Sequence, residues 1–106
     1  METTSLDAMQ KSFSVLVYGV FLGMQTVIPA MKKTEEPCAI VNMSSVCGAY
    51  VATNNNFTYN AAKSAVVGMT KAAAVDLAGS NIRVNTMAQL AELQSAQMFC
   101  RETWKK

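Results

Sequence analysis

A chain of 106 residues is enough for one small domain or for part of a larger one, and this one is 51% hydrophobic, 15% charged and +2 in net charge. Because charged residues average about 25% of a soluble protein, this low share predicts extensive burial, in part against something outside this chain. The basic residues form no stripe and are not interleaved with aromatic residues, so the composition indicates no nucleic-acid partner.

The chain has no histidine, which excludes Ser-His-Asp and Cys-His catalysis and most catalytic zinc sites. Its three cysteines, Cys38, Cys47 and Cys100, show no Cys-x-x-Cys spacing and predict neither a disulfide framework nor a metal site. No signal peptide is apparent at residues 1–4. We therefore expect reduced thiols and a cytoplasmic location.

A first helix is predicted from about Ser5 to Met31, with Thr4 or Ser5 as its cap. Apolar residues recur along it at steps of three and four, but they also fill its other faces, which predicts burial on several sides. Pro29 is expected to bend or shorten the last turns.

The same segment offers a second interpretation, because it is uncharged between Lys11 and Lys32 and is long enough to span a bilayer. It also contains Gly19-x-x-x-Gly23, a spacing found where helices pair in membranes. Polar residues and a proline make it a poor span: Ser12, Ser14, Gln25, Thr26 and Pro29. We therefore favour a buried or subunit-interface helix and regard membrane insertion as the weaker alternative.

A strand–helix–strand unit follows the charged turn at residues 32–37. Residues 39–43 read as a strand covered on both faces, as in a parallel sheet. A long polar loop from Ser44 to Phe57 is of a length that often forms part of a site. A helix from about Thr58 to Ala78 follows, with Gly79 expected to end it, and then a strand over 82–85. Such a unit predicts parallel strands.

Two features of the remaining pattern concern packing. The second helix carries small residues at steps of four, three and four, which predicts close approach to a sheet or another helix: Ala61, Ala65, Gly68 and Ala72. Beyond Met87 the pattern changes, and a weak stripe predicts a C-terminal helix over 88–104, with these residues on one side: Leu90, Leu93, Gln97, Cys100 and Trp104.

Chemistry is expected where Ser44 and Ser45 end the first strand and Tyr59 and Lys63 open the next helix, since a spacing of four places two side chains on one helical face. A nearby ammonium favours the phenolate form of a tyrosine, and such a tyrosine can exchange a proton with an alcohol or an alkoxide. A serine hydroxyl can polarise the same oxygen.

These residue types suit interconversion of an alcohol and a carbonyl, with the hydride exchanged with a nicotinamide cofactor. Alone, the Tyr-x-x-x-Lys pair more often means a core tyrosine and a solvated lysine. Its place beside the carboxyl end of a predicted parallel strand, where ligands bind in open α/β sheets, favours the site.

The ordered motifs at residues 40–45, 59–65, 68–71 and 82–85, together with Gly48, resemble those of the short-chain dehydrogenases/reductases, and residues 18–23 resemble the helix that precedes the family's serine strand. The resemblance covers about residues 5–87, with 88–106 a divergent tail. It implies one partial Rossmann-like α/β domain over 1–106, with the order helix-strand-helix-strand plus a C-terminal helix.

The resemblance also implies roles for individual residues. Tyr59 looks like the proton donor and acceptor, and Lys63 like the residue that promotes tyrosine ionisation and hydrogen-bonds the nicotinamide ribose. Ser45 looks like the serine that orients the substrate, with Ser44 as the fallback. The family implies NAD or NADP as cofactor, a small alcohol or carbonyl as substrate, and homo- or hetero-oligomers formed through the helices at about 5–31 and 58–78.

The departures from the family pattern concern the cofactor and a proton relay. The five glycines, Gly19, Gly23, Gly48, Gly68 and Gly79, form no glycine-rich phosphate-binding turn. The family's catalytic asparagine is replaced by Leu16, and the Pro-Gly after its Arg-Val-Asn by Gln89-Leu90. We therefore expect a truncated family member that is inactive or nearly so alone, or else a non-catalytic fragment that pairs with an intact relative. Neither the substrate nor the choice between NAD and NADP can be read from these residues.

Overall fold

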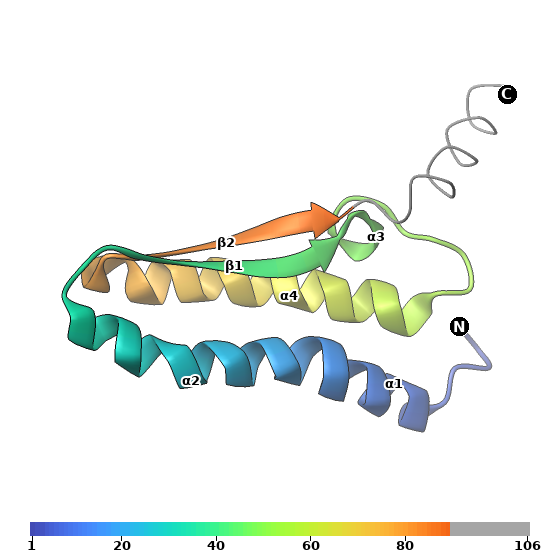
Figure 1. Cartoon of the computed structure of the whole chain (residues 1–106). Helices are drawn as coiled ribbons and strands as arrows, with labels where there is room; N and C mark the ends of the chain where they lie inside the picture. Colours follow the sequence, from blue (N-terminus) through green and yellow to red (C-terminus); the bar gives the residue numbers. More distant parts are fainter. Residues whose placement is uncertain (90–106) are drawn as a thin grey trace, which may run out of the picture.

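The computed structural model describes residues 1–89 (Figure 1). In chain order the elements are α1 (Leu6–Phe13), the π-helix η1 (Ser14–Tyr18), α2 (Gly19–Thr34), β1 (Cys38–Ser45), α3 (Val46–Ala49), α4 (Phe57–Leu77), the 3-10 helix η2 (Ala78–Ser80) and β2 (Ile82–Gln89). Ala88 and Gln89, which were expected to begin the C-terminal helix, belong to β2 instead, and the rest of that expected helix lies outside the described residues.

The elements α1, η1 and α2 follow one another without a break and form the expected first helix. Ser5 caps it, because its Oγ accepts a hydrogen bond from the backbone N–H of Ala8 over 3.1 Å. The expected shortening at Pro29 is wrong, since α2 continues to Thr34. The helix ends where Glu35 adopts a left-handed conformation with φ of 57°, and its last turn carries Lys32 and Lys33, which suit a helix C-terminus.

This long helix is mostly exposed, with Val17 and Met24 as its buried residues. The expectation of burial on several sides is therefore wrong within residues 1–89, because one side meets β1 and α4 and nothing described covers the others. An 18-residue window of the helix Leu6–Thr34 has a mean hydropathy of 1.6, so the helix is, by length and composition, able to cross a membrane. Core helices of soluble proteins share these properties.

The strands β1 and β2 pair in parallel, in a register that runs from Cys38 opposite Ile82 to Ser45 opposite Gln89. The prediction of parallel strands is confirmed, and both strands are longer than the sequence pattern indicated. The helices α2 and α4 both pack against one face of this sheet, and α1 and η1 contact α4 (Figure 1). Between these helices and that face lies the core, formed by Met24, Leu77, Ile82 and Val84.

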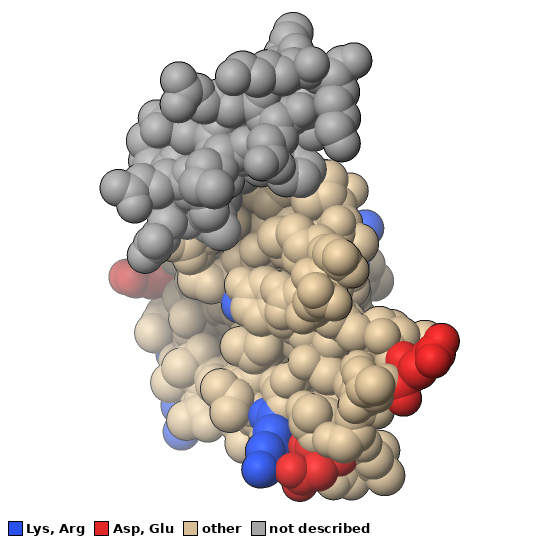
Figure 2. All heavy atoms as spheres, turned by 90° about the vertical axis from the view of Figure 1, so that its right-hand side faces the viewer, with Lys and Arg blue, Asp and Glu red and all other residues tan. Residues whose placement is uncertain are grey.

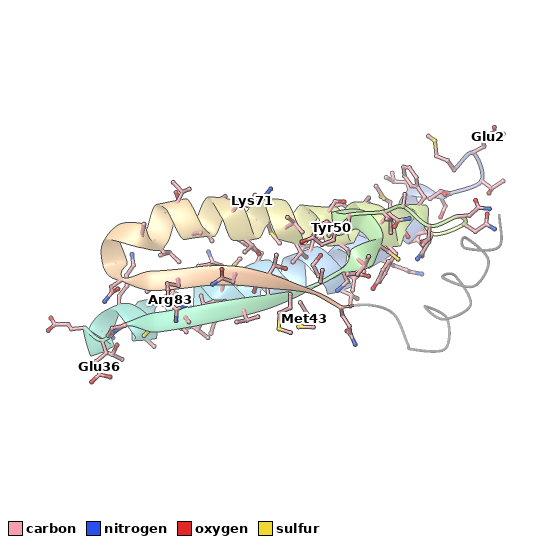
Figure 3. The ribbon with its side chains drawn as sticks, turned by 90° about the horizontal axis from the view of Figure 1, so that it is seen from above. Glu2, Glu36, Met43, Tyr50, Lys71 and Arg83 are labelled. Atoms are coloured by element: carbon pink, nitrogen blue, oxygen red, sulfur yellow. The ribbon has the colours of Figure 1, made fainter. Side chains whose placement is uncertain are left out.

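The opposite face of the sheet is uncovered within residues 1–89. Val41, Met43 and Met87 are 55%, 45% and 59% exposed there. Figure 3 looks down on this face, where Met43 and Arg83 are labelled and no described helix crosses the strands. The prediction that β1 is covered on both faces is therefore wrong for this part of the chain, because α2 and the crossover helix α4 both lie on the same side.

Packing of α4 differs from the expectation in two details. Ala62, Val66, Thr70 and Leu77 are its buried residues, whereas a Cβ placed at Gly68 would meet no atom within 4 Å. The predicted small-residue stripe therefore makes no close approach at Gly68. Gly79 directly follows Ala78, the C-cap of α4, as expected, but it has no positive φ; the left-handed residue is Asn81, with φ of 57°, after η2 and before β2.

Candidate active site

Ser44 and Ser45 occupy the carboxyl end of β1, where they are 2% and 3% exposed. The expectation that both serines end the first strand is confirmed, and the loop that was expected to begin at Ser44 begins only after β1 ends at Ser45. The extended backbone fixes their position beside α4. This is the edge at which ligands bind in open parallel sheets.

The two hydroxyl groups make different hydrogen bonds. Ser44 Oγ donates to the main-chain carbonyl oxygen of Lys63 over 3.0 Å. Ser45 Oγ instead accepts from the backbone N–H of Cys47 over 3.2 Å and caps α3. A hydroxyl has one hydrogen to donate and two lone pairs to accept with. The hydroxyl hydrogen of Ser44 is therefore taken up by the carbonyl oxygen of Lys63. Ser45 only accepts a hydrogen bond, so its hydroxyl hydrogen stays available to another acceptor.

Tyr59 and Lys63 lie one turn apart near the start of α4, and both are half-buried. Lys63 Nζ donates to the main-chain carbonyl oxygen of Met43 over 3.3 Å. The same nitrogen lies 5.7 Å from the centroid of the Tyr59 ring, within the range of a cation–π contact. The structure thus brings Tyr59 and Lys63 together and ties Lys63 to the end of β1.

The short helix α3 is attached to α4 next to this site. Gly48 has φ of +91°, a conformation that L side chains rarely adopt, and its position is so close to the main chain of Asn60 that a Cβ would clash. Its carbonyl oxygen accepts a hydrogen bond from Ser64 Oγ. The structure thus supplies a steric reason for glycine at position 48, because any larger residue would meet the main chain of Asn60.

Asn60, which the sequence offered only as part of the Tyr-Asn-Ala-Ala-Lys motif, holds the loop before α4. Its Nδ2 donates to the carbonyl oxygens of Thr53 and Asn56 over 3.0 and 2.9 Å. Its Oδ1 is buried and has no hydrogen-bond partner. The asparagine-rich loop is therefore attached to α4 and is not simply a solvated connection, a result that depends on tertiary placement.

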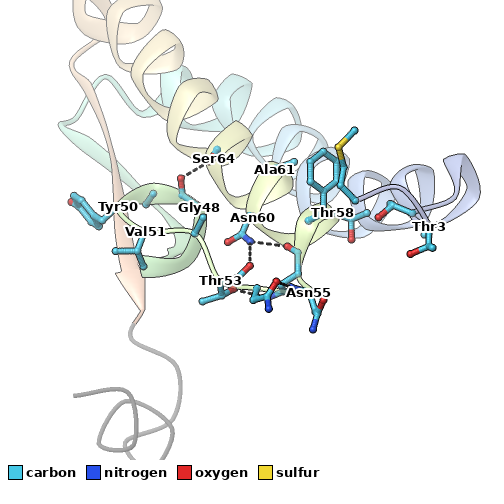
Figure 4. Close-up of a pocket in the computed structure, with 18 of the residues that line it drawn as sticks. Thr3, Gly48, Tyr50, Val51, Thr53, Asn55, Thr58, Asn60, Ala61 and Ser64 are labelled. Carbon is cyan, nitrogen blue, oxygen red and sulfur yellow. Dashed lines mark hydrogen bonds between the residues drawn. The ribbon is translucent and has the colours of Figure 1, made fainter. Parts of the chain in front are cut away.

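A pocket of about 890 Å³ opens beside this loop (Figure 4). It is lined by the N-terminal residues, by the loop that runs from Gly48 to Thr58, and by Asn60 and Ser64 on α4. Ser45, Tyr59 and Lys63 are not among its lining residues. The pocket thus lies next to the site, and the first turns of α4 contribute residues to both.

A buried polar network lies behind the site and joins three elements. Asn42 Nδ2 lies 3.0 Å from Thr70 Oγ1 and 3.4 Å from Met24 Sδ. Thr70 Oγ1 in turn donates to the carbonyl oxygen of Val66 over 2.8 Å. These contacts link β1 to α2 and α4. Sequence reasoning missed this role because nothing local distinguishes a buried asparagine from an exposed one.

Leu16, which stands where the family resemblance places an asparagine, lies within η1. Its side chain is half-buried. π-helical turns occur frequently at functional sites. Leucine, however, offers neither a donor nor an acceptor there.

Figure 2 views the molecule from the side on which the strands finish. Charged side chains on this face are few and are separated by uncharged surface, without a broad patch of one sign. Among the described residues, no group of three or more His, Cys, Asp or Glu side chains is arranged to hold a metal ion.

Comparison with known proteins places this arrangement in a family. A family model described as enoyl-(acyl carrier protein) reductase matches residues 1–94. A cyclopentanol dehydrogenase from Comamonas sp. is 44% identical over 87 residues, which are 82% of this chain and 34% of that protein. The chain belongs to the short-chain dehydrogenase/reductase family.

Other members of the family agree with this assignment. A 3-oxoacyl-(acyl-carrier-protein) reductase from Thermotoga maritima is 47% identical over 75 residues, covering 71% of this chain and 30% of that one. The crystal structure of a 3-ketoacyl-(acyl-carrier-protein) reductase from Brucella melitensis complexed with NADH superimposes with a TM-score of 0.78 and 34% identity. That match covers 85% of this chain and 38% of the Brucella chain.

An acetoin dehydrogenase from Enterobacter cloacae gives a TM-score of 0.79 at 34% identity, over 83% of this chain and 36% of that one. The α/β fold with parallel strands is therefore that of a Rossmann-type short-chain dehydrogenase/reductase. The chain spans about a third of the length of the curated relatives it matches.

Proposed function

We propose that this chain carries the proton-transfer residues of an NAD(P)-dependent oxidoreductase that interconverts an alcohol and a carbonyl. The observation that carries the proposal is the position of Lys63, whose ammonium group lies between the carbonyl oxygen of Met43 and the ring of Tyr59. Membership of the family and the NADH in the Brucella relative's structure support the same conclusion.

Each residue then has a defined task. Tyr59 takes the hydroxyl proton from an alcohol, or gives a proton to the oxygen of a carbonyl in the reverse direction. Ser45 donates its available hydrogen to that same oxygen and polarises it. Ser44 is the weaker candidate for this task, because its hydrogen is directed at the carbonyl oxygen of Lys63.

The residues present fit one end of a nicotinamide cofactor. Lys63 has three N–H donors, and its bond to Met43 leaves two for the ribose hydroxyls. When bound, the nicotinamide supplies or accepts the hydride. The phosphates are different, because none of the five glycines in this sequence forms a glycine-rich turn at a helix N-terminus. We therefore propose that the 106-residue chain binds NAD(P) weakly and is nearly inactive alone.

A fluorescence titration of the purified chain with NADH and NADPH tests this proposal. We expect weak, saturable binding that is lost in Lys63→Ala. Lys71→Ala is the matched control, because Lys71 is exposed two turns further along the same helix (Figure 3). Equal binding by the wild type and both variants would contradict the proposed role of Lys63, and complete absence of binding would contradict a cofactor site in this chain.

A second variant separates proton transfer from binding. Tyr59→Phe removes the hydroxyl group but keeps the ring beside Lys63. We expect it to bind NADH like the wild type and to lose any turnover that the chain shows with a panel of small secondary alcohols and ketones. Turnover retained in Tyr59→Phe would exclude Tyr59 as the proton donor and acceptor.

A non-catalytic interaction role is the second candidate, favoured by the exposed apolar side of the first helix. Val15, Tyr18, Phe21 and Leu22 are all exposed there. An exposed apolar surface of this kind marks a protein–protein contact more often than a free surface. The partner is a second copy of this chain or an intact family member that presents its own corresponding helices.

Co-purification distinguishes this role from catalysis. A tagged chain expressed together with an intact relative, such as the Comamonas cyclopentanol dehydrogenase, is expected to capture that relative and to lower its activity. Phe21→Glu should abolish capture. Arg83→Glu on β2, which is exposed and lies outside both helices, serves as the charge-changing control and should preserve it. A monomeric chain that captures nothing would argue against the interaction role.

A further inference from the structure

The pocket of about 890 Å³ beside the start of α4 has no part in the proposed proton transfer. Three segments form its walls, namely the N-terminal residues, the loop that follows Gly48, and the first two turns of α4. In Figure 4, Tyr50 and Thr3 lie on opposite sides of the start of this helix. Sites for small molecules typically measure about 300–1,000 Å³. The pocket is therefore large enough for a small-molecule ligand.

The pocket lies on a different side of α4 from the proton-transfer residues. Ala61 lines it, whereas Tyr59 and Lys63 do not. Each of these two residues is two positions from Ala61, and a step of two turns an α-helix through about 200°. Tyr59 and Lys63 therefore project from the side of the helix opposite to Ala61. A ligand in the pocket is thus not the molecule that Tyr59 would protonate.

The walls of the pocket are polar but uncharged. Among the described residues that line it, hydroxyl and carboxamide side chains are frequent and no side chain is charged. The side chains of Thr3, Asn55 and Thr58 make no hydrogen bond to other described residues. Hydroxyl and carboxamide groups both donate and accept hydrogen bonds, as the hydroxyl groups of a polyol also do. An ionic ligand, by contrast, finds no opposite charge on these walls.

Two aromatic rings add flat apolar surface to the polar walls. Phe57 is 44% exposed at the start of α4, and Tyr50 is 80% exposed on the loop. Covering such a ring is favourable, because apolar surface is removed from water. The C–H face of a sugar ring covers an aromatic ring, while its hydroxyl groups reach polar side chains nearby. The combination favours a neutral, polyhydroxylated ligand.

The loop wall is held in place by hydrogen bonds within the chain. Asn60 Nδ2 donates to the carbonyl oxygens of Thr53 and Asn56 over 3.0 and 2.9 Å. Asn54 Oδ1 accepts from the backbone N–H of Asn55 over 3.0 Å, and Asn55 is left-handed with φ of 56°. A wall formed in advance lowers the entropy lost on binding.

We propose that this pocket is a binding site for a neutral, polyhydroxylated small molecule of monosaccharide or disaccharide size. Thr3, Asn55 and Thr58 hydrogen-bond the hydroxyl groups of the ligand, and Phe57 packs against its C–H face. The inference is independent of the proposed function, because none of Ser45, Tyr59 and Lys63 lines the pocket.

Calorimetric titration of the full chain with sorbitol, glucose and maltose tests the proposal. Asn55→Gly removes the carboxamide and keeps the backbone, because glycine readily adopts a positive φ. Asn81→Gly is the matched control, since Asn81 has φ of 57° and lies outside this pocket. We expect saturable millimolar binding of at least one probe, severalfold weaker in Asn55→Gly and unchanged in Asn81→Gly. Absence of binding by all three probes, or equal binding by both variants, would overturn the proposal.

Thr58→Val gives a second, independent measurement, because it removes a hydroxyl group at nearly constant shape. It is expected to weaken binding severalfold, whereas Thr26→Val on α2, outside the pocket, should leave binding unchanged. Circular dichroism shows that each variant remains folded.

Glucose 6-phosphate separates a neutral ligand from an anion held at the start of α4, where no side chain caps the helix. We expect glucose 6-phosphate to bind no more tightly than glucose, because the described walls carry no positive side chain. Clearly tighter binding of the phosphate ester would refute the neutral class of ligand and assign the pocket to an anion instead.

Discussion

Ser44 and Lys63 are joined through the main-chain carbonyl oxygen of Lys63, which accepts a hydrogen bond from Ser44 Oγ over 3.0 Å. The side chain of Lys63 returns to the same strand, where its Nζ donates to the carbonyl oxygen of Met43 over 3.3 Å. These two contacts fix the start of α4 against the end of β1. Ser44 thereby uses its hydrogen within the fold, whereas Ser45 Oγ accepts from Cys47 N–H and keeps its own hydrogen available.

The hydrogen bond of Ser44 makes a prediction about stability. Ser44→Ala is expected to lower the free energy of unfolding by about 1 kcal/mol, because a buried hydrogen bond between two elements is lost. Urea denaturation followed by circular dichroism measures the change. Ser12→Ala on the first helix should produce no comparable loss, since Ser12 lies away from this junction. An unchanged midpoint for Ser44→Ala would show that the contact contributes nothing measurable.

Two glycines provide a matched pair of substitutions. Gly48→Ala is expected to destabilise the chain by at least about 2 kcal/mol, because φ is +91° and the new Cβ would meet the main chain of Asn60. Gly68→Ala, where a Cβ meets nothing within 4 Å inside a helix, should stabilise by about 1 kcal/mol. Thermal unfolding of both variants checks the pair. Changes of similar size and the same sign in the unfolding temperatures of the two variants would contradict the described position of Gly48.

The buried network of Asn42 and Thr70 predicts non-additive effects. Asn42→Ala should cost about 1–3 kcal/mol, because it removes a buried amide and leaves a void between β1 and the two helices. Thr70→Val should also destabilise, since Asn42 then loses its oxygen acceptor. In the double variant the combined loss is expected to be smaller than the sum by at least about 0.5 kcal/mol. Strict additivity would mean that the 3.0 Å contact carries no energy.

Replacement at the turn before β2 tests which residue is left-handed there. Asn81→Val is expected to destabilise by about 1–2 kcal/mol, because a β-branched residue is strained at φ of 57°. Asn81→Gly should be tolerated. Gly79→Ala should be neutral or slightly stabilising, because Gly79 has no positive φ. A large loss from Gly79→Ala together with a tolerated Asn81→Val would show that Gly79, and not Asn81, is the left-handed residue at this turn.

Local pattern in the sequence was enough for the order and type of the elements. The small-residue helix over Phe57–Leu77 was predicted to within about a residue at each end, and the parallel pairing of the strands follows from their connection by a single crossover helix. The spacing of Tyr59 and Lys63 placed them on one helical face, and the structure shows the Lys63 ammonium beside the Tyr59 ring. These features depend on residues that are near one another in the chain.

The sequence by itself determined the fold class, the family resemblance and the set of candidate residues Ser44, Ser45, Tyr59 and Lys63. Tertiary structure alone decided which serine has a free hydrogen, which residue before β2 is left-handed, and that one face of the sheet is uncovered in residues 1–89. The physical reason is that propensity and periodicity describe a segment and its immediate neighbours. Hydrogen-bond partners and burial depend instead on contacts between residues distant in the chain, such as Ser44 with Lys63 and Asn42 with Thr70.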